Sequence, residues 1–253
     1  MRVLLAILIL AAGVTWAMPP QTLHNAGRGA AWDGTYPEPI ETDALLWYDF
    51  ADDATRTQTG DSLTSIASKG TDTRAASLST GTATMRYAEI NELDVVELDD
   101  ARLNLTGLTL GETATLLFIY VRETAGIRSA PASVVHVSGA RPMRWETDNT
   151  YSVRWGAKKQ FHGASTDTGV MVDLLLFEEG EAHRLIRNDE EQTGWTSTNT
   201  VLSSASTTGL TALGYNLTAM RHDGYLLEVI AWDYLLSPGE QAEVRKYGKD
   251  KWR

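Results

Sequence analysis

Cysteine is absent from the 253-residue chain, which excludes a disulfide framework and thiolate chemistry and leaves the redox compartment open. Basic residues are also few: 22 Lys and Arg stand against 33 Asp and Glu, and the net charge is -11. Contacts to nucleic-acid phosphates require clustered Lys and Arg. We therefore expect no nucleic-acid partner.

Long apolar runs are missing as well. The most hydrophobic stretch, residues 3–14, has about 12 residues, whereas a membrane-spanning helix needs ~20. We therefore predict no membrane span. Arg2, this stretch and the small-residue site Thr15-Trp16-Ala17 follow the order of a secretory signal. The alternative for residues 1–17 is a buried hydrophobic arm that packs against a partner chain.

Residues 18–43 are rich in Pro, Gly and polar side chains, which is typical of an extended linker or arm with little regular structure. We expect Trp32 and Tyr36 to hold this arm to a surface. Through residues 1–43 the chain would contact other copies of itself or other structural proteins. Residues 44–253 remain as one domain, long enough for a single large core.

Short apolar segments separated by turn residues recur through residues 44–253. Since no helical pattern separates them, they predict about a dozen antiparallel strands in a two-layer β-sandwich. Residues 113–121 are the strongest middle segment, with an apolar run typical of a strand buried on both faces. The other segments expected to form strands are 45–50, 132–137, 142–156 (two strands), 169–177, 182–186, 210–214 and 226–232.

The chain ends in a predicted strand, a short elbow and a helix. Residues 226–232 are apolar except for Glu228. Ser237-Pro238-Gly239-Glu240 then supplies an N-cap serine, a proline at the first helical position and a glutamate that can close a capping box. Trp47, Trp232 and Trp252 are expected to be structural.

This ending resembles the C-terminus of concanavalin A-like, laminin-G-like β-sandwich domains of bacterial and phage proteins. The matching positions are Gly224, Glu228, Trp232, Asp233, Leu236, Ser237, Lys251 and Trp252. The opening Trp47-x-Asp49 is similar too, although residues 68–70 depart from the pattern. The resemblance also implies two short strands that flank a turn within residues 91–105. The resemblance implies an all-β, concanavalin A-like antiparallel β-sandwich (jelly roll) with one short C-terminal helix and an N-terminal arm. It says little about activity, since this sandwich hosts lectins, hydrolases, lyases and virion parts.

Residues 92–97 carry the sharpest candidate for catalysis. They resemble the signature of retaining β-glucanases of this fold, which implies Glu92 as nucleophile, Asp94 as helper and Glu97 as acid/base. Alternate strand residues face one cleft, and a bulge can bring the last carboxylate round to the 5–5.5 Å that suits retention. The alternative is a structural strand before a turn, because the same residues also fit the laminin-G-like pattern.

Acidic residues in predicted loops are weak candidates for a calcium site of the kind that these sandwiches often hold. They are Asp52, Asp53, Asp99 and Asp100. The alternative is that they are solvated surface acids, since none lies in a ligand-spaced motif. The five histidines show no paired spacing that would suit zinc.

Exposed aromatic side chains stack on sugars, so tryptophans in polar surroundings are candidate ligand residues. Trp195 lies in a polar loop and is the best candidate; Trp145 and Trp155 follow, with Arg154 beside them. The alternative for each tryptophan is a place in the core.

These features together predict a non-catalytic carbohydrate-binding, adhesion or assembly module. Its partner would be a glycan or polysaccharide. We expect it to be exported, extracellular or at the cell surface, or alternatively on a virion surface as a decoration, fibre or tail part. The alternative function is a secreted retaining glycoside hydrolase that uses residues 92–97.

Overall fold

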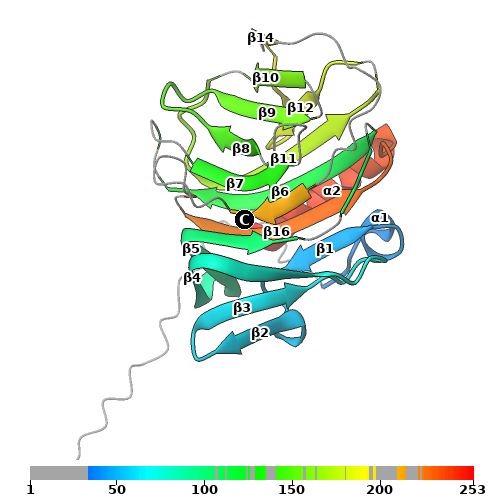
Figure 1. The fold of residues 1–253 in the computed structure, drawn as a ribbon. Helices are drawn as coiled ribbons and strands as arrows, with labels where there is room; N and C mark the ends of the chain where they lie inside the picture. Colours follow the sequence, from blue (N-terminus) through cyan, green and yellow to red (C-terminus); the bar gives the residue numbers. More distant parts are fainter. Residues whose placement is uncertain are drawn as a thin grey trace, which may run out of the picture. The chain divides into compact units, whose positions relative to one another are not determined.

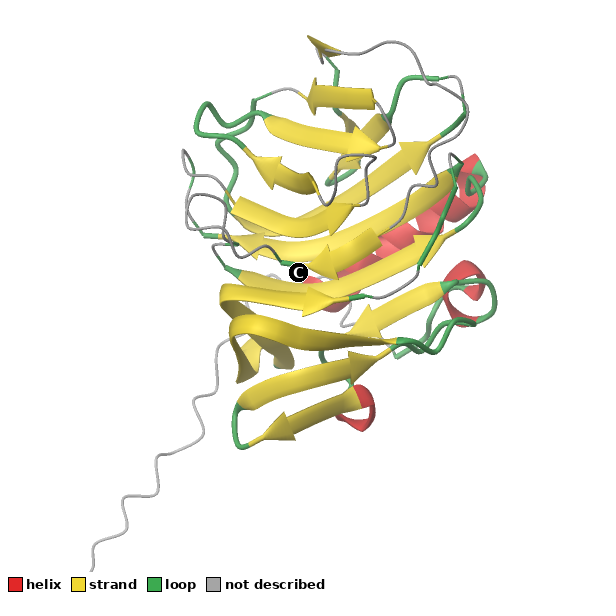
Figure 2. Ribbon diagram, viewed as in Figure 1, coloured by secondary structure: helices red, strands yellow, loops and turns green. Residues whose placement is uncertain are grey.

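The computed structural model describes residues 34–105, 108–111, 113–123, 125, 129–134, 141–155, 158–162, 164–179, 181–193, 196–197, 210–214, 222 and 224–253. These residues form an antiparallel β-structure that ends in one long helix (Figures 1 and 2). The predictions for residues 1–33, including the signal-like segment and Trp32, lie outside the described residues. Among the described residues, no helix is both long and apolar enough to cross a membrane.

The helical elements are α1 (Glu38–Glu41), the 3-10 turn η1 (Asp53–Thr55) and α2 (Pro238–Trp252). The strands are β1 (Leu46–Asp49), β2 (Arg56–Thr59), β3 (Ser62–Ala67), β4 (Ala75–Ile90), β5 (Leu93–Asn104), β6 (Ala114–Arg122), β7 (Ser129–Val134), β8 (Arg141–Trp145), β9 (Tyr151–Trp155), β10 (Lys158–His162), β11 (Gly169–Phe177), β12 (Arg184–Arg187), β13 (Glu190–Glu191), β14 (Thr196–Ser197), β15 (Leu210–Leu213) and β16 (Tyr225–Trp232).

Antiparallel pairing joins these strands into one continuous path. Its order is β13-β12-β11-β6-β16-β5-β15-β7-β8-β9-β10-β14, with β1 added to β16 and β4, β3 and β2 continuing from β5. The path folds over, so that β7 to β10 lie opposite β6, β11 and β12 (Figure 1). The prediction of an all-β antiparallel sandwich with a C-terminal helix is confirmed.

The central strand β6 has apolar residues on both faces because it is covered on both sides. Its Leu116 and Phe118 pack into the core between the layers, whereas Ile119 packs on the other face with α2. Gly248 lets α2 lie close to the sheet, since a Cβ there would stand 2.9 Å from Cδ1 of Ile119. Figure 2 shows α2 running along this outer face.

The C-terminal prediction is confirmed in detail. Strand β16 is fully integrated, pairing with β6 on one side and with β1 on the other. At the start of α2, the Ser237 hydroxyl accepts a hydrogen bond from the Glu240 backbone N–H, and the Glu240 carboxylate accepts one from the Ser237 N–H. The chain thus closes its sheet with β16 and fixes that strand with a capped helix.

One strand was missed and one expectation about strands was wrong. Strand β4 was not predicted, because its Ser- and Thr-rich sequence leaves most side chains exposed and carries no apolar run. Residues 91–105 were expected to hold two strands and a turn, but β5 is one strand of 12 residues. Asp100 takes a left-handed φ of 49°, and the register with β4 shifts across it, since Thr80 pairs with Arg102 and Thr82 with Asp99. A bulge therefore absorbs what was expected to be a turn.

The arm expected to lack regular structure contains one helical turn, α1. Pro37 precedes this turn, and Pro39 and Ile40 are buried. The indole N–H of Trp232 donates to the carbonyl oxygen of Pro39 at 2.7 Å. Tyr36 packs edge-on against Trp47, with ring centroids 4.7 Å apart. The side chain of Tyr36 therefore holds this part of the arm to the sandwich, as expected from its aromatic character.

Candidate functional site

Seven polar and aromatic side chains gather between the two layers, and each is at most 2% exposed. We call them the inner cluster. They are Tyr120, Arg122, Trp145, Tyr151, His162, Asp173 and Arg187. They come from six strands, β6 and β8 to β12, so that only the folded sheet brings them together.

Strand register builds one wall of the cluster. Tyr151 of β9 lies directly opposite Trp145 of β8 and opposite His162 of β10. On the facing layer, Asp173 of β11 lies opposite Arg187 of β12. Cross-strand partners share a face of the sheet, so each set forms a row. The two rows face each other across the core.

Asp173 and Arg187 form a bidentate ion pair, with Nε and Nη2 donating at 2.7 and 2.8 Å. The Tyr120 hydroxyl also donates to Asp173, at 2.9 Å, and in turn accepts the indole N–H of Trp145 at 3.0 Å. Burial works against the charge of Arg187, but the attraction of Asp173 outweighs it and the pKa of Arg187 is raised. A hydrogen-bonded chain therefore links both layers.

Two guanidinium groups contact one indole ring. The Cζ atoms of Arg122 and Arg187 lie 3.7 and 4.1 Å from the ring centroid of Trp145. Such cation–π contacts gain strength when they are desolvated. Trp145 is thus the common support on which both cations are held.

Several polar atoms of the inner cluster have no hydrogen-bond partner in the part of the chain that the structure describes. They are Nε of Arg122, Nη1 of Arg187, the hydroxyl of Tyr151 and both ring nitrogens of His162. A buried polar group without a partner costs about 1–3 kcal/mol. Burial, and then the nearby charge of Arg187, lower the pKa of His162 to about 4, so its ring is neutral at pH 7. The cluster therefore holds hydrogen-bond donors and acceptors that the described residues leave unused.

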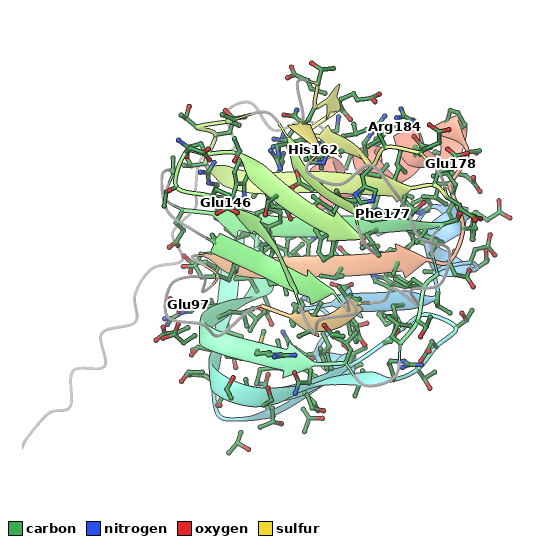
Figure 3. All side chains as sticks on the ribbon, turned by 45° about the horizontal axis from the view of Figure 1, so that its top comes forward. Glu97, Glu146, His162, Phe177, Glu178 and Arg184 are labelled. Carbon is green, nitrogen blue, oxygen red and sulfur yellow. The ribbon has the colours of Figure 1, made fainter. Side chains whose placement is uncertain are left out.

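The inner cluster lies where the strand path ends. β12 and β13 form one end of the path and β10 and β14 the other, and no pairing among the described strands joins β12 to β10. Arg187 and His162 stand on these two facing ends. Figure 3 places His162 well away from Glu97, so the cluster is distinct from the acidic stretch of β5.

The predicted sugar-binding residues divide into two groups. Trp145 belongs to the inner cluster, where it is fully buried. Trp195 and the side chains of Trp155 and Arg154 lie outside the described residues. The partners of Trp145 were not predicted; the one signal for them in the sequence is Asp173, a carboxylate inside an otherwise apolar strand.

The three candidate catalytic acids have separate positions. Glu92 lies in the turn between β4 and β5 with a φ of 65°. Asp94 accepts two hydrogen bonds from Arg56, at 3.0 and 3.1 Å. Glu97 is ion-paired with Arg86 at the surface. Asp94 and Glu97 are thus each held by an arginine.

The four candidate calcium ligands are not assembled into a metal site. Asp52 is ion-paired with Lys69 at 2.8 Å, Asp53 lies in η1, and Asp99 and Asp100 lie at the bulge of β5. Over the described ranges, no group of three or more His, Cys, Asp or Glu side chains is placed to hold a metal ion.

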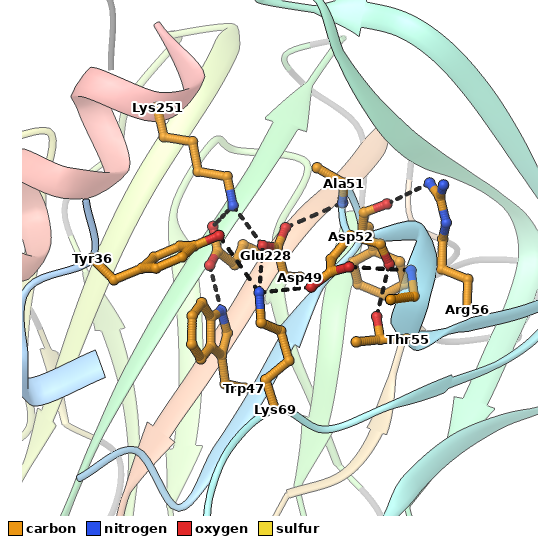
Figure 4. Close-up of polar contacts among 12 residues, drawn as sticks. Tyr36, Trp47, Asp49, Ala51, Asp52, Thr55, Arg56, Lys69, Glu228 and Lys251 are labelled. Carbon is orange, nitrogen blue, oxygen red and sulfur yellow. Dashed lines mark hydrogen bonds and ion pairs between the residues drawn. The ribbon is translucent and has the colours of Figure 1, made fainter. Parts of the chain in front are cut away.

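A second buried polar group lies on the outer face of the sheet and is centred on Glu228 (Figure 4). Its carboxylate accepts hydrogen bonds from the indoles of Trp47 (2.6 Å) and Trp252 (2.8 Å) and from the hydroxyl of Tyr247 (2.7 Å). Lys251 completes its partners at 3.2 Å. We call this the Glu228 cluster; it joins α2 to β1 and β16.

The buried charges in and beside the Glu228 cluster have partners of opposite charge: Lys251 pairs with Glu228 and Asp49, and Lys69 pairs with Asp52. Burial raises the pKa of Glu228, and Lys251 acts in the opposite direction. Burial alone lowers the pKa of Lys69, but its bond to Asp52 and the charge of Asp49 outweigh this and raise that pKa to about 12. Because these charges are paired, we assign the cluster a structural role.

The backbone arrangement is similar to part of a sialidase from Trypanosoma rangeli. The complex of that sialidase with the inhibitor DANA superposes with a TM-score of 0.53 at 10% identity, over 81% of this chain and 32% of that chain. Its covalent intermediate with 2,3-difluorosialic acid gives 0.53 at 11% identity, over 88% and 35%. This chain therefore spans about a third of the length of the sialidase chains it matches, and at this identity the likeness supports the sandwich fold alone.

A third similar structure is domain 4 of the extracellular arabinanase AbnA from Geobacillus stearothermophilus, in complex with arabinotriose. It superposes with a TM-score of 0.48 at 12% identity, over 81% of this chain and 99% of that chain. No protein-family model and no curated protein matches the sequence.

Proposed function

We propose that the chain is a non-catalytic carbohydrate-binding module and that sugar binds at the inner cluster. The observation that carries the proposal is the set of unpartnered polar atoms on Tyr151, His162, Arg122 and Arg187 beside the aromatic rings. Sugar hydroxyls donate and accept hydrogen bonds, and the apolar faces of sugars pack on aromatic rings. A bound sugar would satisfy groups that are otherwise buried at a cost.

The similar structures support this proposal to a limited degree. The Trypanosoma rangeli sialidase that shares the fold has been seen in complex with sialic acid. That protein is about three times longer than the matched region, so we take from it the compatibility of the fold with a sugar-binding protein and nothing about activity.

Titration of the full chain with a panel of polysaccharides tests the proposal. The NMR signals of the tryptophan indole N–H groups report where binding occurs. We expect the Trp145 signal to shift, whereas the signals of Trp47 and Trp252 in the Glu228 cluster should not. Retention of no glycan, or shifts confined to the Glu228 cluster, would contradict the proposal.

The non-catalytic part of the proposal is supported by the arginine partners of Asp94 and Glu97. A retaining pair needs two carboxyl groups that face one substrate. Incubation with each retained glycan should release no reducing ends. Release that is abolished by Glu92→Gln would instead establish the hydrolase.

We further propose that, within the sandwich fold, the chain belongs to the laminin-G-like group. Residues that carried the resemblance meet in space, since Glu228 binds Trp252 of α2 and Trp47 of β1. Superposition on laminin-G-like structures should place equivalent residues at these three positions. Unrelated residues there would contradict the assignment.

We propose that the module works outside the cell, at a cell surface or alternatively on a virion surface. The support is the signal-like order of residues 1–17 and the net charge of -11, both from the sequence. Mass spectrometry of the protein from its natural source decides between the settings. A mature N-terminus at Met18 supports export, and an intact Met1 supports an arm within an assembled particle.

A further inference from the structure

Arg122 is a buried cation without an anionic partner. Its Nη1 donates to the carbonyl oxygens of Ser165 (2.7 Å) and Asp167 (3.2 Å). Its Nη2 donates to the side-chain oxygen of Asn149 at 2.6 Å. In the described part of the chain, no carboxylate lies within ion-pair distance of Arg122. All its acceptors are therefore neutral, and Nε has none.

The charges of the inner cluster do not balance. Arg187 is neutralised by Asp173, which lies opposite it. His162 is neutral at pH 7. Arg122 thus leaves one positive charge among side chains that are almost fully buried. A buried charge without a counter-charge is costly, and an anion that binds beside it relieves that cost.

We propose that the inner cluster takes a sugar that carries a carboxylate, and that the carboxylate pairs with Arg122. This inference rests on the proposed function. A charged acceptor makes shorter and stronger hydrogen bonds to a guanidinium than the neutral carbonyls do, and a carboxylate lies in one plane as the guanidinium does. The sugar ring would then reach the hydroxyl of Tyr151 and the ring of His162.

Residues 164–168 are the loop that contacts Arg122. This segment has no regular secondary structure, and all but one of its residues are exposed. It supplies the two carbonyl oxygens that hold Nη1 of Arg122. The carboxylate of Asp167 is exposed and adds a weak attraction to Arg122 without forming an ion pair. The ligand carboxylate would displace these carbonyls, and Asp167 would oppose it.

Calorimetric titration of the full chain tests the inference. The probes are oligomers of glucuronate, galacturonate and sialic acid, each beside its own neutral methyl ester. We expect one acid to bind about tenfold or more tightly than its ester, because only the acid pairs with the cation. Arg122→Gln should remove this preference, so that the acid and its ester bind with similar affinity. Asp167→Asn should strengthen binding of the acid by about threefold, since a repelling charge is lost.

Surface variants serve as matched controls. Arg86→Gln changes the net charge as Arg122→Gln does, but Arg86 is an exposed residue paired with Glu97. Asp53→Asn matches Asp167→Asn in the same way. Neither control should alter the preference for the acid. Should Arg122→Gln fail to fold, Arg122→Lys retains the cation without Nε and should bind the acid about tenfold more weakly.

The outcomes separate this inference from the proposed function. Equal binding of acid and ester overturns the carboxylate and leaves a carbohydrate-binding module. Tighter binding of dextran sulfate than of any of the carboxylated sugars also overturns it. A preference for the acid that survives Arg122→Gln overturns the role of Arg122. Binding of none of the glycans removes the proposed function, and this inference with it.

Discussion

Asp49 and Glu228 lie directly opposite each other on β1 and β16, and one ammonium group bridges their carboxylates. Nζ of Lys251 stands 2.8 Å from Asp49 and 3.2 Å from Glu228. Both acids are almost fully buried, so that without a cation their charges would repel in a medium of low dielectric constant. Helix α2 therefore contributes the charge that allows the two strands to pair here.

Lys251→Met should lower the free energy of unfolding by about 3–5 kcal/mol at pH 7, since it removes the cation beside the buried Glu228 and leaves Asp49 with only its 3.4 Å contact to Lys69. Burial raises the pKa of Glu228, and loss of the cation raises it further. Protonation removes the repulsion, so the deficit should shrink as the pH falls. Denaturant unfolding at pH 7 and pH 5 measures both effects. Lys246→Met is the control, because Lys246 is exposed on the same helix; an equal loss in both variants would contradict the bridging role.

Alkaline pH should weaken the same region through Lys69. The pKa of Lys69 is raised to about 12, so its stabilisation is fully present below its ordinary value of 10.5 and is lost as the pH rises through 12. The difference corresponds to about 2 kcal/mol. Lys69→Arg keeps its charge in this range and should lose less stability between pH 10 and pH 12. The same alkaline slope in both proteins would show that Lys69 is not the group that titrates.

The parts of the fold that could be predicted are those that depend on patterns of neighbouring residues in the sequence. The capping box at Ser237 and the apolar run of β16 each occupy consecutive residues. The tight turn between β12 and β13 is of the same kind: its central residues Asn188 and Asp189 have positive φ, which Asn and Asp tolerate. In each case the physical cause lies within a few residues of its effect.

The inner cluster could not be predicted because its contacts join residues that are distant in the sequence. Tyr120 meets Asp173 across 53 positions, and Trp145 meets Tyr120 across 25. The polar sequence around certain tryptophans led us to expect exposed side chains, but the exposure of a side chain depends on which strands cover it in the folded protein. Strand β4 was missed for a related reason: its pairing with β5, and not its own apolar content, makes it a strand.

Acid should destabilise the protein through His162. Its pKa is lowered to about 4, so the folded state keeps the ring neutral while the unfolded chain takes up a proton below about 6.5. Stability is therefore lost as the pH falls from 6.5 towards 4, by about 2 kcal/mol between pH 7 and pH 5. The charges that face the ring are those of Arg187 and Asp173, which are paired with each other.

His162→Phe should remove this part of the pH dependence. Phenylalanine keeps an aromatic ring at this position but has no titratable group, so nothing here takes up a proton in the unfolded chain. Unfolding midpoints at pH 7 and pH 5 should lie closer together in the variant than in the parent. An unchanged difference would assign the acid sensitivity to another group.

Tyr151→Phe should raise stability and weaken sugar binding at the same time. The Tyr151 hydroxyl is buried and has no hydrogen-bond partner over the described residues, and removing such a group can recover about 1 kcal/mol. If a sugar supplies the missing partner, the same change costs the complex a hydrogen bond, about tenfold in affinity when its partner is left unpaired. If the Tyr151 hydroxyl instead stabilised the fold, Tyr151→Phe would lower the free energy of unfolding.

Tyr87→Phe is the matched control, since the exposed Tyr87 hydroxyl is bonded to Gln58 and its removal should affect neither stability nor sugar binding. Denaturation in the absence of sugar and titration with the tightest ligand measure the two effects, and a stability gain without loss of affinity would place the sugar elsewhere on the molecule.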